Sequence, residues 1–406
     1  MTKTVLVYLD TGEPLKIGYL YLDEVAGKEV FSFSYSTDYI ERGNPSFIVD
    51  TSLFFDLARQ PAPSDRGLFG AIMDSCPDRW GRMLIKAKEE AMANKENRRP
   101  RHLSELDYLL GVSDYSRMGA LRFKTSEDGP FLSESIDVPP LEFLGKMEEV
   151  SRKIEDREPV EEKELLMLIA PGSSLGGARP KCSVEGKDGS LWLAKFPSKG
   201  DDYDVSSFEI VTRDLAALCG INVPEARVAS FSRYGKTFLS KRFDRIEGKR
   251  IPYSSAMCLL GKTDGEEASY LDIVGFIQSH SSTPKDDLVE LYKRLLFSLI
   301  IGNTDDHLRN HGFLFDGKGY RLSPAFDINP NCEKDRMTLS LDGYSHQRDL
   351  NLAMSLSGFF YIRTEEAEEI KALIQRIVKE NYFSLTKKYG IPEADATRFY
   401  KNFLLD

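Results

Sequence analysis

The feature that most constrains this chain is a polar loop placed between two apolar segments. The run Leu295–Ile301 contains a single polar residue, Ser298, and ends an apolar helical pattern. Residues 302–310 follow with the sequence GNTDDHLRN, and an apolar hairpin pattern around a glycine turn comes next. A loop held between a buried helix and a hairpin is a fixed platform of the kind that carries functional side chains.

Three polar residues of this region have the spacing of a phosphotransfer centre. Asp305 and Asn310 stand at the ends of a D-x-x-x-x-N motif, and Asp327 follows the hairpin. Protein kinases use that motif for a catalytic aspartate and a metal-binding asparagine, with a second metal-binding aspartate beyond a short hairpin. One carboxylate meets the attacking hydroxyl, while an amide oxygen and the other carboxylate hold Mg²⁺ across the nucleotide phosphates. The motif alone is common in turns, so its combination with Asp327 carries the prediction of a kinase.

A lysine in an otherwise apolar strand provides a second signal. Lys195 ends the run LWLAK, and burying an unpaired ammonium is costly, so this residue requires an anionic partner. In kinases such a lysine contacts the nucleotide phosphates and pairs with a helix glutamate, for which Glu209 on the next predicted helix is the candidate. A lysine whose ammonium reaches solvent from an edge strand is the alternative interpretation.

A serine- and glycine-rich segment, Pro171–Lys181, precedes that strand. Consecutive glycines let backbone N–H groups approach phosphate oxygens, and basic side chains add charge. The residues that would make these contacts are Gly176, Gly177, Ala178, Arg179 and Lys181. The segment lacks the Walker arrangement G-x-x-x-x-G-K-(S/T), so a P-loop NTPase is not indicated. An ordinary surface loop is the alternative interpretation.

The strand end Leu239–Arg245 is a third candidate for nucleotide contact. It lies where a small mixed lobe would join a helical lobe, so a hinge there could offer backbone groups and the Phe243 ring to an adenine. Lys241 is the basic residue of the same strand end. The alternative interpretation is a charged strand end with one core aromatic residue.

Periodicity and turn residues divide the chain into three regions. Alternating runs near the N-terminus predict a small antiparallel sheet, at Thr4–Leu9, Ile17–Leu22 and Phe31–Tyr35. Helical patterns follow at residues 78–90, 103–110 and 141–169. A mixed lobe comes next, with strands at residues 190–196, 226–231 and 237–243 and a helix at 206–218. The last region is mostly helical, at residues 270–279, 286–301, 364–389 and 392–405.

These patterns predict an α+β chain with a bilobal protein-kinase-like fold. We expect an N-terminal β-rich subdomain over residues 1–112, a kinase small lobe over 113–250 and a helical large lobe over 251–406. A net charge of -10 argues against a stand-alone nucleic-acid binder. Five scattered cysteines form no CxxC pair, the N-terminus lacks a signal-peptide pattern, and no apolar run is long enough to span a bilayer. A cytoplasmic protein is therefore expected.

Several motifs together resemble the HipA family, the kinase toxins of bacterial HipBA-type toxin–antitoxin modules. Residues Thr304–Asn310 are similar to the family's T-D-(G/D)-H-x-x-N catalytic loop, and Phe326-Asp327 resembles its metal-binding segment. Arg242–Arg245 is similar to its R-F-D-R hinge strand, and Ser174–Lys181 to its S-x-x-G-A-x-x-K phosphate loop. Pro77–Gly81 resembles the P-D-x-x-G turn of its N-terminal subdomain.

The resemblance implies a role for each matching residue. Asp305 would be the catalytic base, Asn310 and Asp327 the Mg²⁺ ligands, and Ser174 the autophosphorylated loop serine, with the neighbouring Ser173 as the alternative. The residues implied in nucleotide binding are Gly176, Gly177, Ala178, Arg179, Lys181, Lys195, Glu209, Lys241, Phe243, His307, Asn310 and Asp327. Best-known members carry Gln-Glu where this chain has Arg179-Pro180, and an acidic residue where it has Lys241.

The function expected from this resemblance is an ATP- and Mg²⁺-dependent serine/threonine protein kinase of toxin type. By analogy with the family, its substrate is a translation-related protein such as an aminoacyl-tRNA synthetase. A helix-turn-helix antitoxin is the expected partner, and DNA is contacted only through that complex. A catalytically silent pseudokinase acting as co-repressor is the alternative. A small-molecule kinase of the aminoglycoside type would require His-Gly-Asp before the loop, where this chain has Gly302-Asn-Thr.

Overall fold

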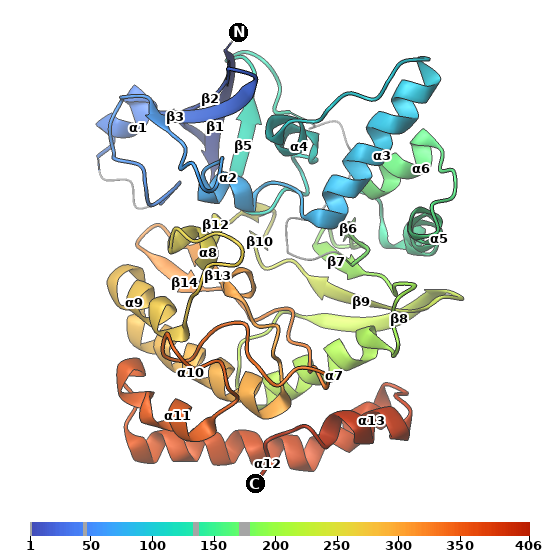
Figure 1. Cartoon of the computed structure of the whole chain (residues 1–406), viewed down its shortest axis with the longest axis vertical. Coiled ribbons are helices and arrows are strands. Elements are labelled where there is room, and N and C mark those ends of the chain that lie inside the picture. The colour runs from blue at the N-terminus through green and yellow to red at the C-terminus, as the bar shows by residue number, and fades with distance from the viewer. Residues whose placement is uncertain (1, 44–46, 133–137, 170–178) are drawn as a thin grey trace. The chain divides into compact units, whose positions relative to one another are not determined.

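The computed structural model describes residues 2–43, 47–132, 138–169 and 179–406 (Figure 1). Internal contacts group the chain into two compact units. The N-terminal unit comprises Met1–Lys199, Phe231–Tyr234 and Lys241–Thr263, and the C-terminal unit comprises Gly200–Ser230, Gly235–Ser240 and Asp264–Asp406. This grouping does not test the three domain boundaries expected above, which stay a prediction.

An antiparallel sheet of five strands is the centre of the N-terminal unit. The strands are β1 (Lys3–Asp10), β2 (Pro14–Val25), β3 (Lys28–Tyr35), β4 (Gln60–Pro61) and β5 (Leu121–Lys124), in the order β4-β3-β2-β1-β5. The three alternating runs therefore form the sheet that the sequence predicts, because their apolar residues, such as Val7, Leu20 and Phe33, are buried. Strand β5 has four residues, too few to show an alternating pattern.

Helix α3 (Arg79–Lys95) begins where the sequence predicts a helix. The Asp78 carboxylate accepts a hydrogen bond of 2.8 Å from the backbone N–H of Gly81 and so caps the first turn. The charged stretch predicted as helical over residues 141–169 forms three pieces, η1 (Leu141–Phe143), α5 (Leu144–Glu155) and α6 (Glu162–Ile169). Arg157 takes a left-handed φ of 57° and is followed by Glu158 and Pro159, which stops α5.

The remaining elements of the N-terminal unit are short. They are α1 (Thr37–Glu41), α2 (Gly70–Asp74), α4 (Glu105–Gly111), β6 (Lys181–Glu185), β7 (Leu191–Lys195), β10 (Arg245–Ile246), β11 (Lys249–Arg250), β12 (Tyr253–Ser255) and α8 (Ala256–Leu259). Strands β6 and β7 form an antiparallel hairpin in which Lys181 is paired directly with Lys195. Residues of both β8 (Ala226–Ser232) and β9 (Gly235–Lys241) fall in each of the two units.

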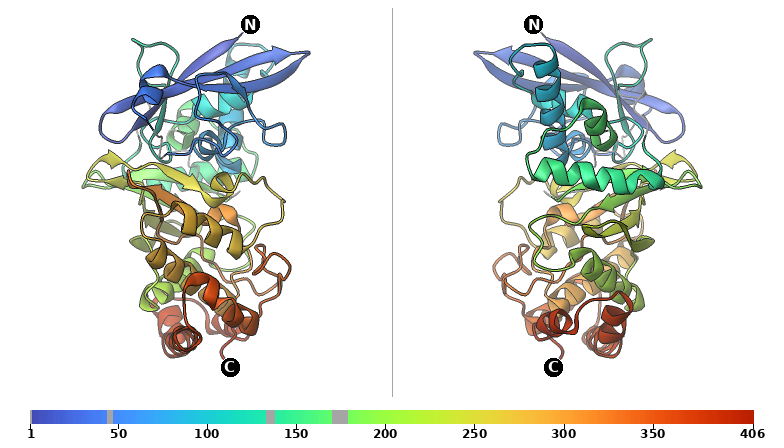
Figure 2. Two further views of the ribbon diagram at one scale, coloured as in Figure 1. Left: turned by 90° about the vertical axis from the view of Figure 1, so that its left-hand side faces the viewer. Right: turned by 90° about the vertical axis from the view of Figure 1, so that its right-hand side faces the viewer.

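The C-terminal unit is mostly helical, as the sequence predicts. Its elements are α7 (Val205–Leu218), α9 (Tyr270–His280), α10 (Pro284–Ile301), η2 (Leu308–Asn310), β13 (Gly312–Phe315), β14 (Tyr320–Leu322), α11 (Leu350–Ser355), η3 (Ser357–Phe360), α12 (Thr364–Lys388) and α13 (Glu393–Tyr400). The long helix α12 packs against α7 and α10, which Figures 1 and 2 show from three sides. Helix α13 ends at Tyr400, five residues before the predicted end at Leu405.

Helix α10 forms the core of this unit and delivers the polar loop. It begins with a proline in the first turn and buries almost every residue of its second half. Gly302 ends the helix in the left-handed conformation, with a φ of 75°. A side chain at this position would also meet the Arg348 guanidinium at 3.2 Å. Among the helices that the structure describes, none combines the length and apolar character needed to cross a bilayer.

Candidate active site

The loop after α10 is fixed by backbone hydrogen bonds to the segment 331–339 of the same unit. The carbonyl of Gly302 accepts from the N–H of Asn331 at 2.8 Å. The carbonyl of Thr304 accepts from both the N–H and the hydroxyl of Thr338, at 2.9 and 3.1 Å. These contacts hold the backbone immediately before Asp305, so the loop is a built platform within the C-terminal unit.

The two adjacent aspartates of the loop have opposite environments. Asp305 is exposed, whereas Asp306 is 4% exposed and lies among Tyr270, His311 and Ser298. Burial acts to raise the pKa of Asp306, but the contacts with His311 and Tyr270 outweigh burial and hold that pKa below its ordinary value. Asp305 is therefore the carboxylate of the pair that a substrate could reach.

Asn310 closes the other end of the loop. Its backbone N–H donates to the carbonyl of His307 at 2.8 Å, and its side-chain nitrogen donates to the carbonyl of Asp305 at 3.3 Å. In this orientation the amide nitrogen is held by the loop, and the amide oxygen is the atom suited to a metal ion. The side chain of Asn310 thus ties the loop to the residue predicted as the catalytic base.

Asp327 follows strand β14 and has an unusual backbone. Its φ is 59°, a conformation that residues other than glycine seldom take and that is found more often at functional sites. The side chain of Asn329 donates to the Asp327 carboxylate at 3.2 Å, and the hydroxyl of Thr212 donates to the carbonyl of Ile328 at 2.5 Å. Thr212 lies on α7 one turn after the buried Glu209, so α7 holds the segment that carries Asp327.

One small cavity brings these segments together. Asn310, Phe326 and Ile328 line the same space of about 20 Å³, and the last two flank Asp327 in the chain. Asn310 and the Asp327 segment therefore converge within the C-terminal unit. No three His, Cys, Asp or Glu residues form a metal cage among the residues that the structure describes. An amide and one carboxylate still fit Mg²⁺, which binds through few protein ligands and keeps phosphate and water ligands.

The predicted site residues are distributed over both units. Asp305, His307, Asn310, Asp327 and Glu209 belong to the C-terminal unit, and Arg179, Lys181, Lys195, Lys241 and Phe243 belong to the N-terminal unit. Gly176, Gly177, Ala178 and both candidate serines, Ser173 and Ser174, lie outside the described residues. The pairing of Lys195 with Glu209 stays a prediction.

Lys181 lies on a strand and has a buried partner in the N-terminal unit. Its ammonium is 3.0 Å from the Asp78 carboxylate, and both side chains are at most 4% exposed. Asp78 therefore caps α3 with one oxygen and contacts the lysine with the other. Burial raises the pKa of Asp78, and the charge of Lys181 opposes that rise. This second role of Asp78 was not predicted, because nothing in the sequence marks residues 78 and 181 as neighbours.

The R-F-D-R segment forms a buried ionic network. Arg242 holds Asp244 through two hydrogen bonds of 2.7 and 2.6 Å, and Arg245 adds a third of 2.6 Å. The Asp244 carboxylate also accepts from the N–H of Gly119 at 2.7 Å, and Arg242 donates to the carbonyl of Ser116 at 2.9 Å. These charged residues therefore bind the loop 113–119 to the segment 242–245, a structural role that the sequence did not indicate.

Two residues predicted for nucleotide binding, Lys241 and Phe243, lie next to this network in the chain. The ammonium of Lys241 is 6.0 Å from the centre of the Trp192 ring, and the Phe243 ring packs at 6.2 Å from the Tyr253 ring. Phe243 is half-buried. These contacts leave its predicted role in nucleotide binding untested.

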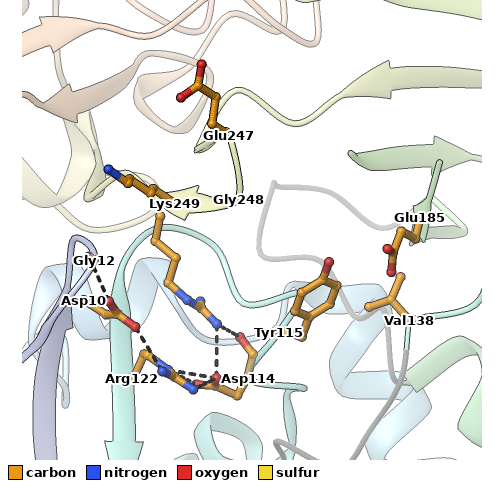
Figure 3. A pocket seen from close by; sticks show the side chains of 11 residues that line it. Asp10, Gly12, Asp114, Tyr115, Arg122, Val138, Glu185, Glu247, Gly248 and Lys249 are labelled. Carbon is orange, nitrogen blue, oxygen red and sulfur yellow. Dashed lines mark hydrogen bonds and ion pairs between the residues drawn. The ribbon is translucent and has the colours of Figure 1, made fainter. Parts of the chain in front are cut away.

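A larger pocket of about 700 Å³ lies in the N-terminal unit (Figure 3). Figure 3 shows Arg122 between Asp10 and Asp114 in its wall, and Arg250 donates to Asp114 at 3.1 Å. The positive charges of Arg122 and Arg250 are thus balanced by the carboxylates of Asp10 and Asp114. Within the described part of the chain, none of the residues predicted for phosphotransfer or nucleotide binding lines this pocket.

Comparison with known proteins decides the family. A model of the HipA-like C-terminal domain matches residues 173–382, which is more than half of the 406 residues. The chain belongs to the HipA family. It is 26% identical over 267 residues to the serine/threonine-protein kinase toxin HipA of Shewanella oneidensis, a match that covers 55% of this chain and 59% of that protein.

Other relatives are matched over shorter lengths. A candidate kinase of Sinorhizobium fredii, Y4dM, is 29% identical over 161 residues, which cover 36% of this chain and 38% of that protein. The curated relatives are thus matched over 38% to 59% of their own lengths. Their names place the chain in a kinase-like toxin family.

A solved structure confirms the fold. The Shewanella oneidensis HipA, solved with HipB and operator DNA, covers 98% of this chain and is itself covered over 96%, with a TM-score of 0.67 and 17% identity. The predicted α+β class and kinase-like fold are therefore confirmed, and so is the resemblance to the HipA family.

Removing the charge at the centre of the R-F-D-R network should destabilise the N-terminal unit. We expect Asp244→Asn to lower the free energy of unfolding by about 3–5 kcal/mol, because it leaves two buried guanidinium groups without their anion. Urea unfolding measures this, with Asp128→Asn on an exposed residue as the control. Equal stability of the two variants would contradict a structural role for the network.

The same network predicts a pH dependence. Burial acts to raise the pKa of Asp244, but Arg242 and Arg245 outweigh burial and hold it well below its ordinary value. The ionised Asp244 therefore stabilises the folded state above its unfolded pKa of about 3.9, and this contribution is lost as pH falls through the folded pKa. Between about pH 4 and pH 2 the wild type should lose more stability than Asp244→Asn.

The buried lysine makes a separate prediction. Lys181→Met should lower the free energy of unfolding by about 3–5 kcal/mol, because it strands the Asp78 carboxylate in an apolar environment. Adding Asp78→Asn should recover part of that loss, since asparagine still caps α3 without a buried charge. Lys187→Met, on the exposed turn of the same hairpin, is the matched control. Equal stability of Lys181→Met and Lys187→Met would contradict a structural role for the ion pair between Lys181 and Asp78.

Proposed function

We propose that this chain is an ATP- and Mg²⁺-dependent serine/threonine protein kinase of toxin type. The observation that carries the proposal is the difference in exposure between two adjacent aspartates in the loop after α10: Asp305 is exposed and Asp306 is buried. A catalytic carboxylate must be reachable by a substrate hydroxyl and still be held in place. Asp305 meets both conditions, because hydrogen bonds fix the backbone on either side of it.

In the proposed mechanism Asp305 accepts the proton of a serine or threonine hydroxyl. Asn310 and Asp327 would hold Mg²⁺, the first through its amide oxygen and the second through its carboxylate. Mg-ATP, when bound, would supply the γ-phosphoryl group to the hydroxyl oxygen and leave as ADP, with the Mg²⁺ charge offsetting the negative charge on the phosphate oxygens. Contacts from Thr212 and Asn329 hold the segment of Asp327, so the ligand pair would need little rearrangement.

We assign nucleotide binding to the residues that the family resemblance implies. We assign the phosphates to Arg179, Lys181, Lys195 and the loop residues 176–178, with Glu209 as partner of Lys195, and the base to the strand end at Lys241 and Phe243. We also assign His307, from the same loop as Asn310, to nucleotide binding. Arg179 supports the phosphate assignment, because it donates to the carbonyl of Phe196, directly after Lys195, at 3.4 Å. That contact holds the end of the proposed phosphate loop next to the strand lysine.

We further propose that the kinase modifies its own loop. Ser174, or the neighbouring Ser173, would be phosphorylated in the segment that precedes Arg179. A phosphoserine carries roughly two negative charges, which would repel the ATP phosphates and silence the enzyme.

Partners follow from the family. The solved relative was determined with HipB and operator DNA, and we propose a HipB-like helix-turn-helix antitoxin as the partner of this chain, with DNA contacted through that complex. The protein substrate would be a component of translation such as an aminoacyl-tRNA synthetase. All five cysteines are free and four are buried, which suits the reducing cytoplasm in which we place the protein.

The same solved complex supports a second candidate function, a silent pseudokinase that acts as co-repressor. It requires binding of the antitoxin and of operator DNA without phosphotransfer. The exposed Asp305 and its convergence with Asn310 favour the kinase, because a co-repressor has no use for a reachable carboxylate on a fixed loop.

Mass spectrometry after incubation with Mg-ATP tests the kinase. The wild type should carry phosphate on Ser174 or Ser173, and Asp305→Asn should incorporate it at least about 100-fold more slowly, because the general base is lost. Asp286→Asn, on an exposed residue in the first turn of α10, is the matched control and should react at the wild-type rate. Undiminished phosphate on Asp305→Asn would show that Asp305 is not the base. No phosphate on the wild type or on an added synthetase would support the co-repressor.

A further inference from the structure

Asp306 lies at the meeting point of three elements in the C-terminal unit. The hydroxyl of Tyr270, the first residue of α9, donates to one oxygen of its carboxylate. Nε2 of His311, just before β13, lies 2.9 Å from the other oxygen. The hydroxyl of Ser298 on α10 is 3.5 Å away. All four side chains are at most 5% exposed, so water does not weaken these contacts.

The positions of Asp306 and His311 in the chain indicate what this cluster connects. Asp306 directly follows Asp305, and His311 directly follows Asn310. The contact between Asp306 and His311 therefore joins the two ends of the D-x-x-x-x-N loop from behind. The Tyr270 ring packs edge-on against the His311 ring at 5.5 Å, which holds the imidazole in place.

The backbone of the loop is tied to the same point. The carbonyl of Asp306 accepts a hydrogen bond of 3.1 Å from the N–H of Leu339. Two residues earlier in the loop, the carbonyl of Thr304 accepts from the N–H of Thr338. Asp305 is thus exposed between two anchored neighbours. A rotation of the Asp306 side chain would free one end of the loop, and a shift of about 1 Å in a reacting group can cost on the order of 100-fold in rate.

We propose that Asp306 is a positioning residue, whose contact with His311 sets the separation between the base Asp305 and the metal ligand Asn310. The inference rests on the proposed function for the roles of Asp305 and Asn310. The contact between Asp306 and His311 is part of the structure whatever those roles are. Asp306 does not touch substrate or metal in this role, because Tyr270 and His311 occupy its oxygens.

The kinetic test separates positioning from a general loss of folding. Asp306→Asn and His311→Gln should each raise the Mg²⁺ concentration for half-maximal activity about fivefold or more and lower kcat by about tenfold or more. The double variant should be no worse than the more impaired single variant, because both remove the same contact. Partial unfolding would lower the active fraction and leave the Mg²⁺ dependence unchanged. Tyr270→Phe, which keeps the ring, provides a milder variant should either substitution fail to fold.

Hydrogen exchange without nucleotide tests the cross-link independently of activity. The amides of Asn310 and Leu339 should exchange at least about tenfold faster in Asp306→Asn and His311→Gln, while amides in the middle of α10 stay protected. Unchanged exchange overturns the cross-link. Faster exchange with an unchanged Mg²⁺ dependence overturns the positioning role. An inactive wild type defeats the proposed function, and the positioning role with it, while the exchange result still decides whether the cross-link exists.

Discussion

The burial of one carboxylate organises the candidate site. Asp306 can remain ionised in the interior only because Tyr270 and His311 meet both of its oxygens, and a buried carboxylate without such partners would be very costly. These contacts hold the Asp306 side chain in the interior, whereas the adjacent Asp305 is exposed.

Two further buried ionic contacts perform a similar task in the N-terminal unit. Asp244 binds the loop 113–119 to the R-F-D-R segment, and Asp78 binds the start of α3 to Lys181 on β6. Such contacts add little net stability compared with apolar packing, but breaking them by removing one partner is costly. These contacts therefore fix the relative position of segments that are distant in the sequence.

The sequence predicted the elements well and the environments of individual residues poorly. Helix α10, its following loop and the β13–β14 hairpin follow from an apolar period interrupted by polar and glycine residues. Asp305 and Asp306 are chemically identical neighbours, however, and the contacts of Asp306 with Tyr270 on α9 and with His311 just before β13 distinguish them. The network around Asp244 could not be predicted from the sequence either, because its partners near residue 119 lie more than 120 positions away in the chain.

The same limit applies to the strand lysines. The family resemblance placed Lys181 at the end of a phosphate loop, whereas strand pairing places it on β6 opposite Lys195, and like charges directly opposite in a sheet repel each other. Asp78 offsets the charge of Lys181, so the hairpin tolerates both lysines. Asp78 in the P-D-x-x-G turn thus offsets part of the charge of this hairpin, in addition to starting a helix.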